Sequence, residues 1–242
     1  MKRDYHTFTY KDSNFRISSD LTAVVCAEIV RQRELLEAYI VRQPLFKSSL
    51  VPMGLTTDAP EIAQDMNRAS GIVGVGPLAA VAGAIAQRGA LAAIAVGAKE
   101  AIVENGGDIF AVSRQPLLVG LHAGEGSPFN RMALKLDPQD MPRAICSSSS
   151  RMGHSLSLGA CDLATVVAQN AALADAAATM ACNMVKTDGD ISQALDYITS
   201  LPGIDGALII NQGRIGLKGS LPELIRNDDA STEDKITRAI QP

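Results

Sequence analysis

The chain has 242 residues, of which 47% are hydrophobic and 20% charged, and a formal net charge of −4 at pH 7. These proportions are typical of a folded globular protein. The acidic balance argues against nucleic acid or an anionic membrane surface as the main partner, although local basic pockets for phosphates stay open. The most apolar stretch, residues 72–101, is interrupted by glycines, a proline and charged residues. No membrane span of ~18 apolar residues is therefore expected.

The amino-terminal segment and the cysteines indicate in which cellular compartment the protein is expected. The segment MKRDYHTFTYKDSNFRIS alternates as a strand does and has no apolar signal-peptide core. The cysteines have no CxxC spacing and lie in or beside predicted core segments, at Cys26, Cys146, Cys161 and Cys182. Reduced, buried thiols are expected. Together these features predict a cytoplasmic protein.

Up to residue 90 the pattern predicts a hairpin followed by three helices. Asp20 and Asp58 are expected to cap the first two helices, and Pro60 lies in the first turn of the second. The predicted elements are strands at 5–10 and 14–18, and helices from 20 to about 42, from 58 to about 71 and from 77 to about 87.

From residue 100 onward most segments have the pattern of strands. Strands meeting as hairpins, with helices grouped between them, predict an α+β protein with a mainly antiparallel sheet. We expect a single domain, with a hairpin and helices at 1–70, a motif-bearing core at 71–217 and a polar tail at 227–242. The predicted elements are strands at 101–104, 108–112, 117–122, 132–136, 144–150, 163–168, 207–210 and 214–217, and helices at 169–183 and 191–200.

The helix predicted at 169–183 carries the first chemical signal. Asp175 and Thr179 are separated by i, i+4 and lie one turn apart on the same face, among alanines that let another element approach closely. A carboxylate and a hydroxyl in this arrangement form part of a site for a hard cation such as Mg²⁺, which prefers oxygen ligands. The alternative is a tightly packed helix on which Asp175 is a solvated or capped charge.

Two further segments are candidate ligand loops. In Asn105-Gly106-Gly107-Asp108 the glycines can expose backbone N–H groups to an anion or a flat ring, or simply form a hairpin turn. The serine run that includes Ser148, Ser149 and Ser150 is followed by Arg151 and His154. Hydroxyls, a guanidinium and an imidazole suit phosphate binding, and the alternative is a solvated linker.

The glycine-rich segment at 74–83 matches no known phosphate loop. It contains neither GxGxxG nor GxxxxGK[ST], so no dinucleotide site or P-loop is predicted. Its small residues are expected to let this helix press against the helix of Asp175. His6 and His122 have no carboxylate or cysteine at metal-ligand spacing, so both are expected to be structural or exposed.

The segment at 76–86, the turn at 105–108 and Ala174-Asp175-Ala-Ala-Ala-Thr179 occur in an order that resembles the ApbE-like superfamily. Its enzymes are Mg²⁺-dependent FAD:protein FMN transferases, and the resemblance covers residues 70–217. It implies a T-fold-like α+β architecture with packed alanine-rich helices. It also implies FAD or FMN as a ligand, and a divalent metal bound by Asp175, Thr179 and a backbone carbonyl near Ala82.

The chain also departs from that family. Its transferases carry a Lys-Gly-Tyr-Ala-x-Asp-like segment in the first helix, whereas residues 79–84 here are Ala-Ala-Val-Ala-Gly-Ala. The segment around His154 keeps only the histidine of a family loop. The chain therefore resembles a cytosolic side branch, and relatives of that kind are sometimes associated with anaerobic sulfur assimilation toward homocysteine.

Three hypotheses stay open at this point. The first is a Mg²⁺-dependent enzyme that acts on a flavin nucleotide or other pyrophosphate, with His154 moving a proton and an acceptor protein as partner. The second is a binding or accessory protein that keeps the pocket without transfer chemistry. The third is a sulfur-assimilation factor in which Cys146 or Cys182 handles sulfide. The small-residue helices and the strand-rich edge also favour a homo-dimer.

Overall fold

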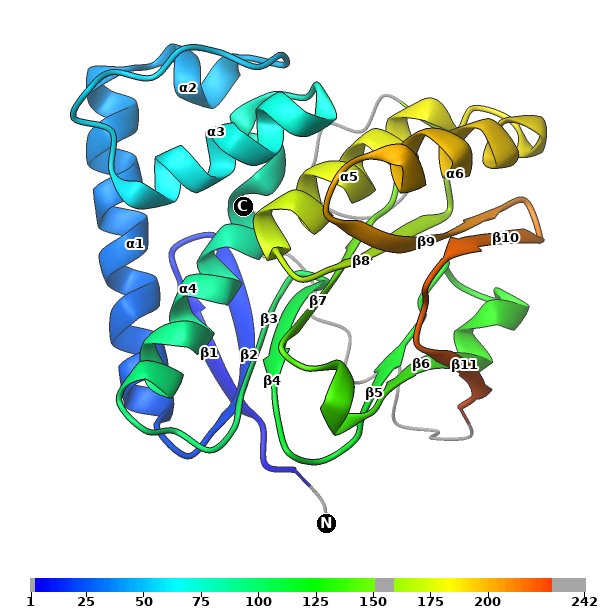
Figure 1. The fold of residues 1–242 in the computed structure, drawn as a ribbon, viewed down its shortest axis with the longest axis horizontal. Coiled ribbons are helices and arrows are strands. Elements are labelled where there is room, and N and C mark those ends of the chain that lie inside the picture. Colours follow the sequence, from blue (N-terminus) through cyan, green and yellow to red (C-terminus); the bar gives the residue numbers. More distant parts are fainter. Residues whose placement is uncertain (1–2, 151–158, 228–242) are drawn as a thin grey trace.

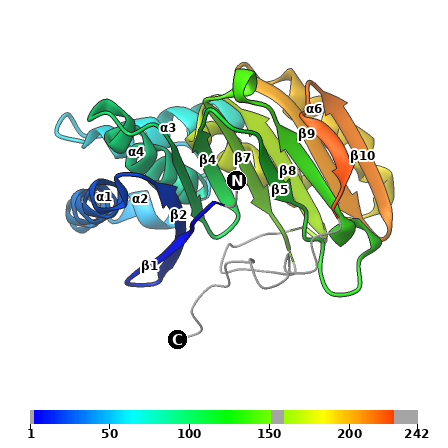
Figure 2. The same cartoon turned by 90° about the horizontal axis from the view of Figure 1, so that it is seen from below.

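The computed structural model describes residues 3–150 and 159–227. Its centre is one antiparallel sheet in which the strands lie in the order β1-β2-β3-β4-β7-β8-β9-β10. Helices cover one face of this sheet (Figures 1 and 2). The strands are β1 (His6–Tyr10), β2 (Ser13–Ser19), β3 (Ala101–Asn105), β4 (Asp108–Val112), β7 (Arg143–Ser148), β8 (Leu163–Ala168), β9 (Ile204–Asn211) and β10 (Arg214–Gly219).

A second, three-stranded sheet in the order β11-β6-β5 packs on the opposite face of the main sheet. It consists of β5 (Leu117–Gly120), β6 (Met132–Leu136) and β11 (Glu223–Arg226). Because side chains alternate along a strand, each strand of the main sheet contributes to two cores. Cys146 and Val166 belong to the core under the helices, and Ile145 and Val167 belong to the core under the small sheet.

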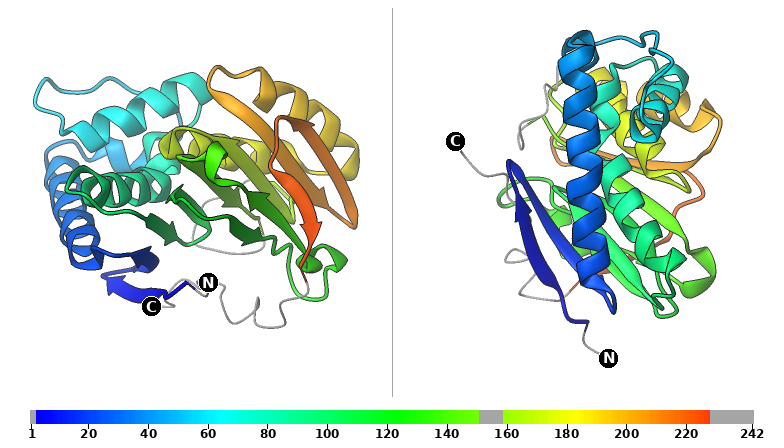
Figure 3. Two further views of the ribbon diagram at one scale, coloured as in Figure 1. Left: turned by 60° about the horizontal axis from the view of Figure 1, so that its bottom comes forward. Right: turned by 90° about the vertical axis from the view of Figure 1, so that its left-hand side faces the viewer.

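In the described part of the chain, the helical layer contains six α-helices and a 3₁₀ turn, η1 (Pro77–Ala80), that leads into α4. Figure 3 shows α1 running along one side of the molecule beside the β1–β2 hairpin. The α-helices are α1 (Thr22–Arg42), α2 (Leu45–Ser48), α3 (Glu61–Val73), α4 (Val81–Ala95), α5 (Ala171–Met184) and α6 (Ile191–Ser200).

The predicted α+β class, the antiparallel sheet and the packed alanine-rich helices are confirmed. The hairpins around residues 11–12, 106–107 and 212–213 form where the glycine and polar turns predict them. Cys146, Cys161 and Cys182 are fully buried, Cys26 is half-buried, and all four are free thiols. The polar tail predicted from residue 227 falls largely outside the described residues.

Both predicted aspartate caps are wrong. Asp20 accepts a hydrogen bond from the Lys99 N–H at 3.1 Å, so it joins distant segments, and α1 begins at Thr22 without a side-chain cap. Asp58 accepts from the Thr56 hydroxyl at 2.6 Å and pairs with Arg42. The helix α3 begins after Pro60 and ends at Val73, where Gly74 adopts a left-handed conformation with φ of +88°.

The helix α4 extends to Ala95 instead of ending near Gln87. Gly89 does not stop the helix, because it lies where α4 meets α1: a Cβ there would lie 3.1 Å from the Ile29 side chain. The stretch Pro77–Ala95 is long and apolar enough to cross a membrane by length and composition, and 44% of that window is buried inside this fold. In this structure it is a core helix between α1, α5 and the sheet.

The helices α4 and α5 come into close contact at Gly83. A Cβ at this position would lie 2.2 Å from the carbonyl oxygen of Ala171 and 3.0 Å from the Cβ of Asp175. Only glycine therefore fits here without displacing backbone. The sequence prediction that small residues press these two helices together is confirmed.

Gly83→Ala should lower the free energy of unfolding by roughly 1–3 kcal/mol or more, because the added methyl group overpacks a contact with backbone. Gly71→Ala is the matched control, since Gly71 lies in α3 and a Cβ added there would have no neighbouring atom within 4 Å. It should be neutral or stabilise the protein by up to about 1 kcal/mol. Urea unfolding of both variants tests this, and a Gly83→Ala protein as stable as the wild type would contradict it.

Candidate functional site

The contact between α4 and α5 buries the carboxylate of Asp175 against backbone. The Gly83 N–H donates to Asp175 Oδ2 at 2.9 Å, and the Ala82 N–H also stabilises the charged form. Asp175 is only 9% exposed. Its carboxylate therefore lies beside the start of α4, close to the peptide units of Ala82 and Gly83.

A second carboxylate, Asp108, approaches the same place from the sheet. It is the first residue of β4, it is 7% exposed, and it lies on the face of the sheet that the helices cover, as does Phe110. Its Oδ1 accepts from the Ser147 N–H at 3.3 Å. The charge of Asp175 acts directly on Asp108. Two buried carboxyl groups from distant segments are thus brought together.

Burial dominates the electrostatics of this pair. Burial, and then the charge of Asp175, raise the pKa of Asp108 well above its usual range, and a hydrogen bond with Cys146 opposes that shift. Burial raises the pKa of Asp175 to about 7, against the opposing effect of the Gly83 and Ala82 N–H groups. None of these groups is a cation. Near neutral pH the pair must either hold a proton or be compensated by a positive charge that these groups do not supply.

The groups near Asp175 that could hold a metal are oxygens. The Asn105 side chain donates to the carbonyl oxygen of Ala82 at 3.4 Å, so this carbonyl lies near the turn of the β3–β4 hairpin. Thr179 follows Asp175 by one turn and is half-buried. Among residues 3–150 and 159–227, no cluster of three His, Cys, Asp or Glu side chains could hold a metal ion. A metal here would need carbonyl and hydroxyl oxygens, which fits Mg²⁺ and disfavours zinc.

The predicted glycine turn has the expected conformation. Gly106 and Gly107 have φ angles of +64° and +104°, and they join β3 to β4. Nothing lies within 4 Å of a Cβ built on Gly106, so the outer side of the turn is open. Asn105, at the end of β3, is 7% exposed and faces the helices.

The serines that the sequence predicts as phosphate ligands do not all lie in the same surroundings. Ser148 lies on the same face as Cys146, toward α5, and its Oγ is buried without a hydrogen-bond partner. Ser149, the residue after the end of β7, is also buried. Ser150 Oγ accepts from the Cys161 N–H and lies 3.1 Å from Cys182 Sγ, which ties it to the end of α5. Arg151 and His154 lie outside the described residues.

Two cavities lie elsewhere in the described structure. One of about 340 Å³ is bordered by α1, α3, α4 and the start of α5, and includes Asp65 and Arg88 in its lining. The other, of about 280 Å³, lies between the two sheets near Arg143. Neither is lined by Asp108 or Asp175. The carboxylate pair remains the stronger candidate, because two buried titratable groups with raised pKa values are typical of functional sites.

A family model described as "AbpE bacteria" matches residues 2–215. The chain belongs to this family. Similar curated relatives are UPF0280 proteins of methanogens. The protein of Methanocella arvoryzae is 37% identical over 90% of this chain and 93% of its own length, and that of Methanothrix thermoacetophila is 40% identical over 86% and 88%.

Solved structures show the same fold at low sequence identity. A mutant form of the flavin transferase ApbE from Vibrio cholerae has a TM-score of 0.58 and 12% identity, and covers 91% of this chain and 98% of its own. The ApbE protein of Thermotoga maritima has a TM-score of 0.53 and 14% identity, over 97% and 100%. The resemblance that the motifs indicate is thereby confirmed at the level of family and fold.

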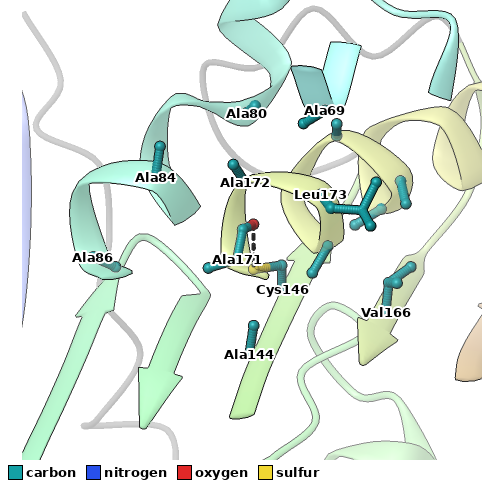
Figure 4. Packing of buried hydrophobic residues seen from close by; sticks show 14 of the residues in the cluster. Ala69, Ala80, Ala84, Ala86, Ala144, Cys146, Val166, Ala171, Ala172 and Leu173 are labelled. Atoms are coloured by element: carbon teal, nitrogen blue, oxygen red, sulfur yellow. Dashed lines mark hydrogen bonds between the residues drawn. The ribbon is translucent and has the colours of Figure 1, made fainter. Parts of the chain in front are cut away.

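The sequence motifs point to Asp108 and Asp175 separately, but not to the interaction of their charges or to Cys146, the cross-strand neighbour of Asp108. Cys146 is fully buried, and its thiol donates to the carbonyl oxygen of Ala171 at 3.5 Å (Figure 4). The signal that could have found it is the alternation along β7, which places Cys146 and Ser148 on the face that carries Asp108. Burial and the nearby carboxylates raise the pKa of the Cys146 thiol, which makes it a poor nucleophile.

Asp108→Asn should stabilise the metal-free protein at pH 8 but have little effect at pH 5. Because burial raises the pKa of both carboxyl groups, the folded protein still binds protons at pH values where the unfolded chain has released them. The free energy of unfolding is therefore highest at low pH and falls as the pH rises from about 4 through about 7. Asparagine removes one buried charge, and a gain of roughly 1–3 kcal/mol at pH 8 follows from about 1.4 kcal/mol per pKa unit.

Thermal unfolding of the metal-free variant at both pH values measures this difference. Asp196→Asn is the control, because Asp196 is exposed and pairs with Lys218 on the surface. Equal stabilisation by Asp108→Asn at pH 5 and pH 8 would show that the folded protein does not raise the pKa of Asp108.

Proposed function

We propose that this protein binds a flavin nucleotide, FAD or FMN, or a related pyrophosphate ligand, together with Mg²⁺ at the Asp108–Asp175 pair. The observation that carries the proposal is the burial of two carboxyl groups whose charges interact. Asp175 lies against the Gly83 and Ala82 N–H groups, and among the residues that the structure describes no cation is one of the groups that set the two pKa values. A divalent cation would compensate both charges at once.

Each part of the proposed site has a separate task. Asp175, Thr179 and the carbonyl of Ala82 would hold Mg²⁺, which when bound neutralises charge that develops on phosphate oxygens. The flavin nucleotide would bind at the β3–β4 turn, which consists of Asn105, Gly106, Gly107 and Asp108. The backbone of this turn is open on its outer side and could contact the ligand. Ser148, whose buried hydroxyl has no hydrogen-bond partner among the described residues, would add a donor on the helix-covered face of β7.

Other members of the site are proposed from the sequence alone. Ser149, Ser150 and Arg151 would bind phosphate oxygens of the ligand, and His154 would move a proton. The ApbE proteins of similar fold include a flavin transferase, and this likeness supports a flavin-nucleotide ligand and an acceptor protein as partners for this chain. A cytoplasmic location and a homo-dimer belong to the same proposal.

A second candidate is a binding or accessory protein without transfer chemistry, including one that serves anaerobic sulfur assimilation toward homocysteine. The alanines of residues 79–84 favour it, because they stand where the resembling transferases carry lysine, an aromatic residue and an acid. A flavinylation assay with an acceptor peptide separates the two candidates. Turnover supports a transferase, and saturable FAD binding without turnover supports the accessory protein.

Asp175→Asn should weaken Mg²⁺-dependent binding of FAD by at least about tenfold. The amide keeps the acceptor for the Gly83 N–H but removes the charge that the cation requires. Isothermal calorimetry with FAD and with FMN, each with and without Mg²⁺, measures this loss.

The control for that titration is Asp196→Asn, an exposed substitution on α6 that should bind FAD as the wild type does. Two results would end the proposal. One is an absence of binding by the wild-type protein at millimolar Mg²⁺, and the other is undiminished Mg²⁺-dependent binding by Asp175→Asn.

A further inference from the structure

Cys146 lies beside Asp108 on the helix-covered face of the sheet, although the family motifs do not include it. It is in the middle of β7, its side chain is fully buried, and its Sγ is 3.5 Å from the carbonyl oxygen of Ala171 at the start of α5. Figure 4 shows the thiol directed at the first turn of that helix. The side chain therefore lies between the sheet that carries Asp108 and the helix that carries Asp175.

The register of the sheet places Asp108 beside Cys146. Ile109 of β4 pairs with Ile145 of β7, so Asp108 and Cys146 follow as the next cross-strand neighbours on the helix-covered face. The Ser147 N–H already donates to Asp108 Oδ1 at 3.3 Å. The Cys146 thiol also lowers the pKa of Asp108 and so favours its charged form. Two neighbouring residues of β7 thus act on the same carboxyl group.

The thiol has a single hydrogen and two acceptors within reach. One is the neutral carbonyl of Ala171, and the other is the carboxylate of Asp108. An ionised carboxylate is the stronger acceptor, so a charged Asp108 favours a rotation of the thiol from Ala171 toward the carboxylate. The charged form of Asp108 then has a donor from the side chain of Cys146 and a donor from the backbone of Ser147.

We infer that Cys146 is a positioning residue that holds the ionised Asp108 carboxylate in the orientation a bound divalent cation requires. This inference rests on the proposed function and adds to it a residue that determines cation affinity. The thiol itself is neither ligand nor nucleophile, because burial and two neighbouring carboxyl groups keep it protonated. Its effect on the cation passes through Asp108.

The test is Mg²⁺ affinity, measured by calorimetry on the full-length protein at pH 8. Cys146→Ser keeps a hydroxyl donor of similar size, so its affinity should stay within about threefold of wild type. Cys146→Ala removes the donor and should weaken Mg²⁺ binding by roughly 10–100-fold, the usual range for an outer-shell partner. Rescue by serine is a result that a purely structural role would not give.

Cys161→Ala is the matched control. It removes another fully buried thiol, whose Sγ contacts the carbonyl of Ile210 instead of a carboxyl group. Its Mg²⁺ affinity should equal that of wild type even if its stability falls. If Cys146→Ala does not fold, Cys146→Val fills the site without a donor and should show the same loss of affinity.

The double variant Cys146→Ala with Asp108→Asn tests whether Cys146 affects Mg²⁺ binding through Asp108. Once Asp108 is uncharged, removing the thiol should have no further effect on Mg²⁺ affinity, whereas an equal loss in both backgrounds would overturn the inference. Unchanged affinity in Cys146→Ala or Cys146→Val, with normal binding by the wild type, also overturns it and leaves the proposed function intact. No Mg²⁺ binding by the wild type overturns both.

Discussion

The contact between α4 and α5 at Gly83 is the constraint on which the candidate site depends. Because position 83 has no side chain, the carbonyl of Ala171 and the Cβ of Asp175 can approach the backbone of α4 at a distance that any other residue would prevent. The Gly83 N–H then donates to Asp175. A carboxylate is thereby fixed in the interior of the protein beside the N–H groups of Ala82 and Gly83.

The sheet supplies the other half of the arrangement. Hairpin β3–β4 brings Asn105 and Asp108 to the same end of the sheet, and β7 adds Cys146 and Ser148 on the helix-covered face. Burying two carboxyl groups together costs free energy unless a proton or a cation compensates them. The rest of the fold, with apolar cores on both faces of one sheet, must stabilise this unfavourable cluster. Such a local cost is expected at functional sites.

Local patterns in the sequence predict much of the fold. Alternation and turn glycines give the hairpins and the antiparallel sheet, and the alanine and glycine content of the segments around Gly83 and Asp175 predicts that two helices pack tightly. The caps fail because Asp20 and Asp58 have stronger partners elsewhere: Asp20 bonds the distant Lys99 N–H, and Asp58 bonds Thr56 and Arg42. The strand β11 is missed because its pairing with β6 is what makes it a strand.

The candidate site shows the same division between local and non-local information. Asp175 and the glycine turn can be singled out from spacing and composition, because each motif is contiguous. The approach of Asp108 to Asp175 depends on strand order and helix placement, and the role of Cys146 depends on the register of β4 against β7. None of these relations is encoded at a fixed spacing along the chain.

The most direct measurement is anomalous scattering from crystals soaked in Mn²⁺, which substitutes for Mg²⁺ and can be located independently of the protein atoms. A peak within about 2.5 Å of the Asp175 carboxylate and the Ala82 carbonyl is the predicted result. Ordered Asp108 and Asp175 side chains with no peak between them at saturating Mn²⁺ would contradict the central claim that this buried pair binds a divalent cation.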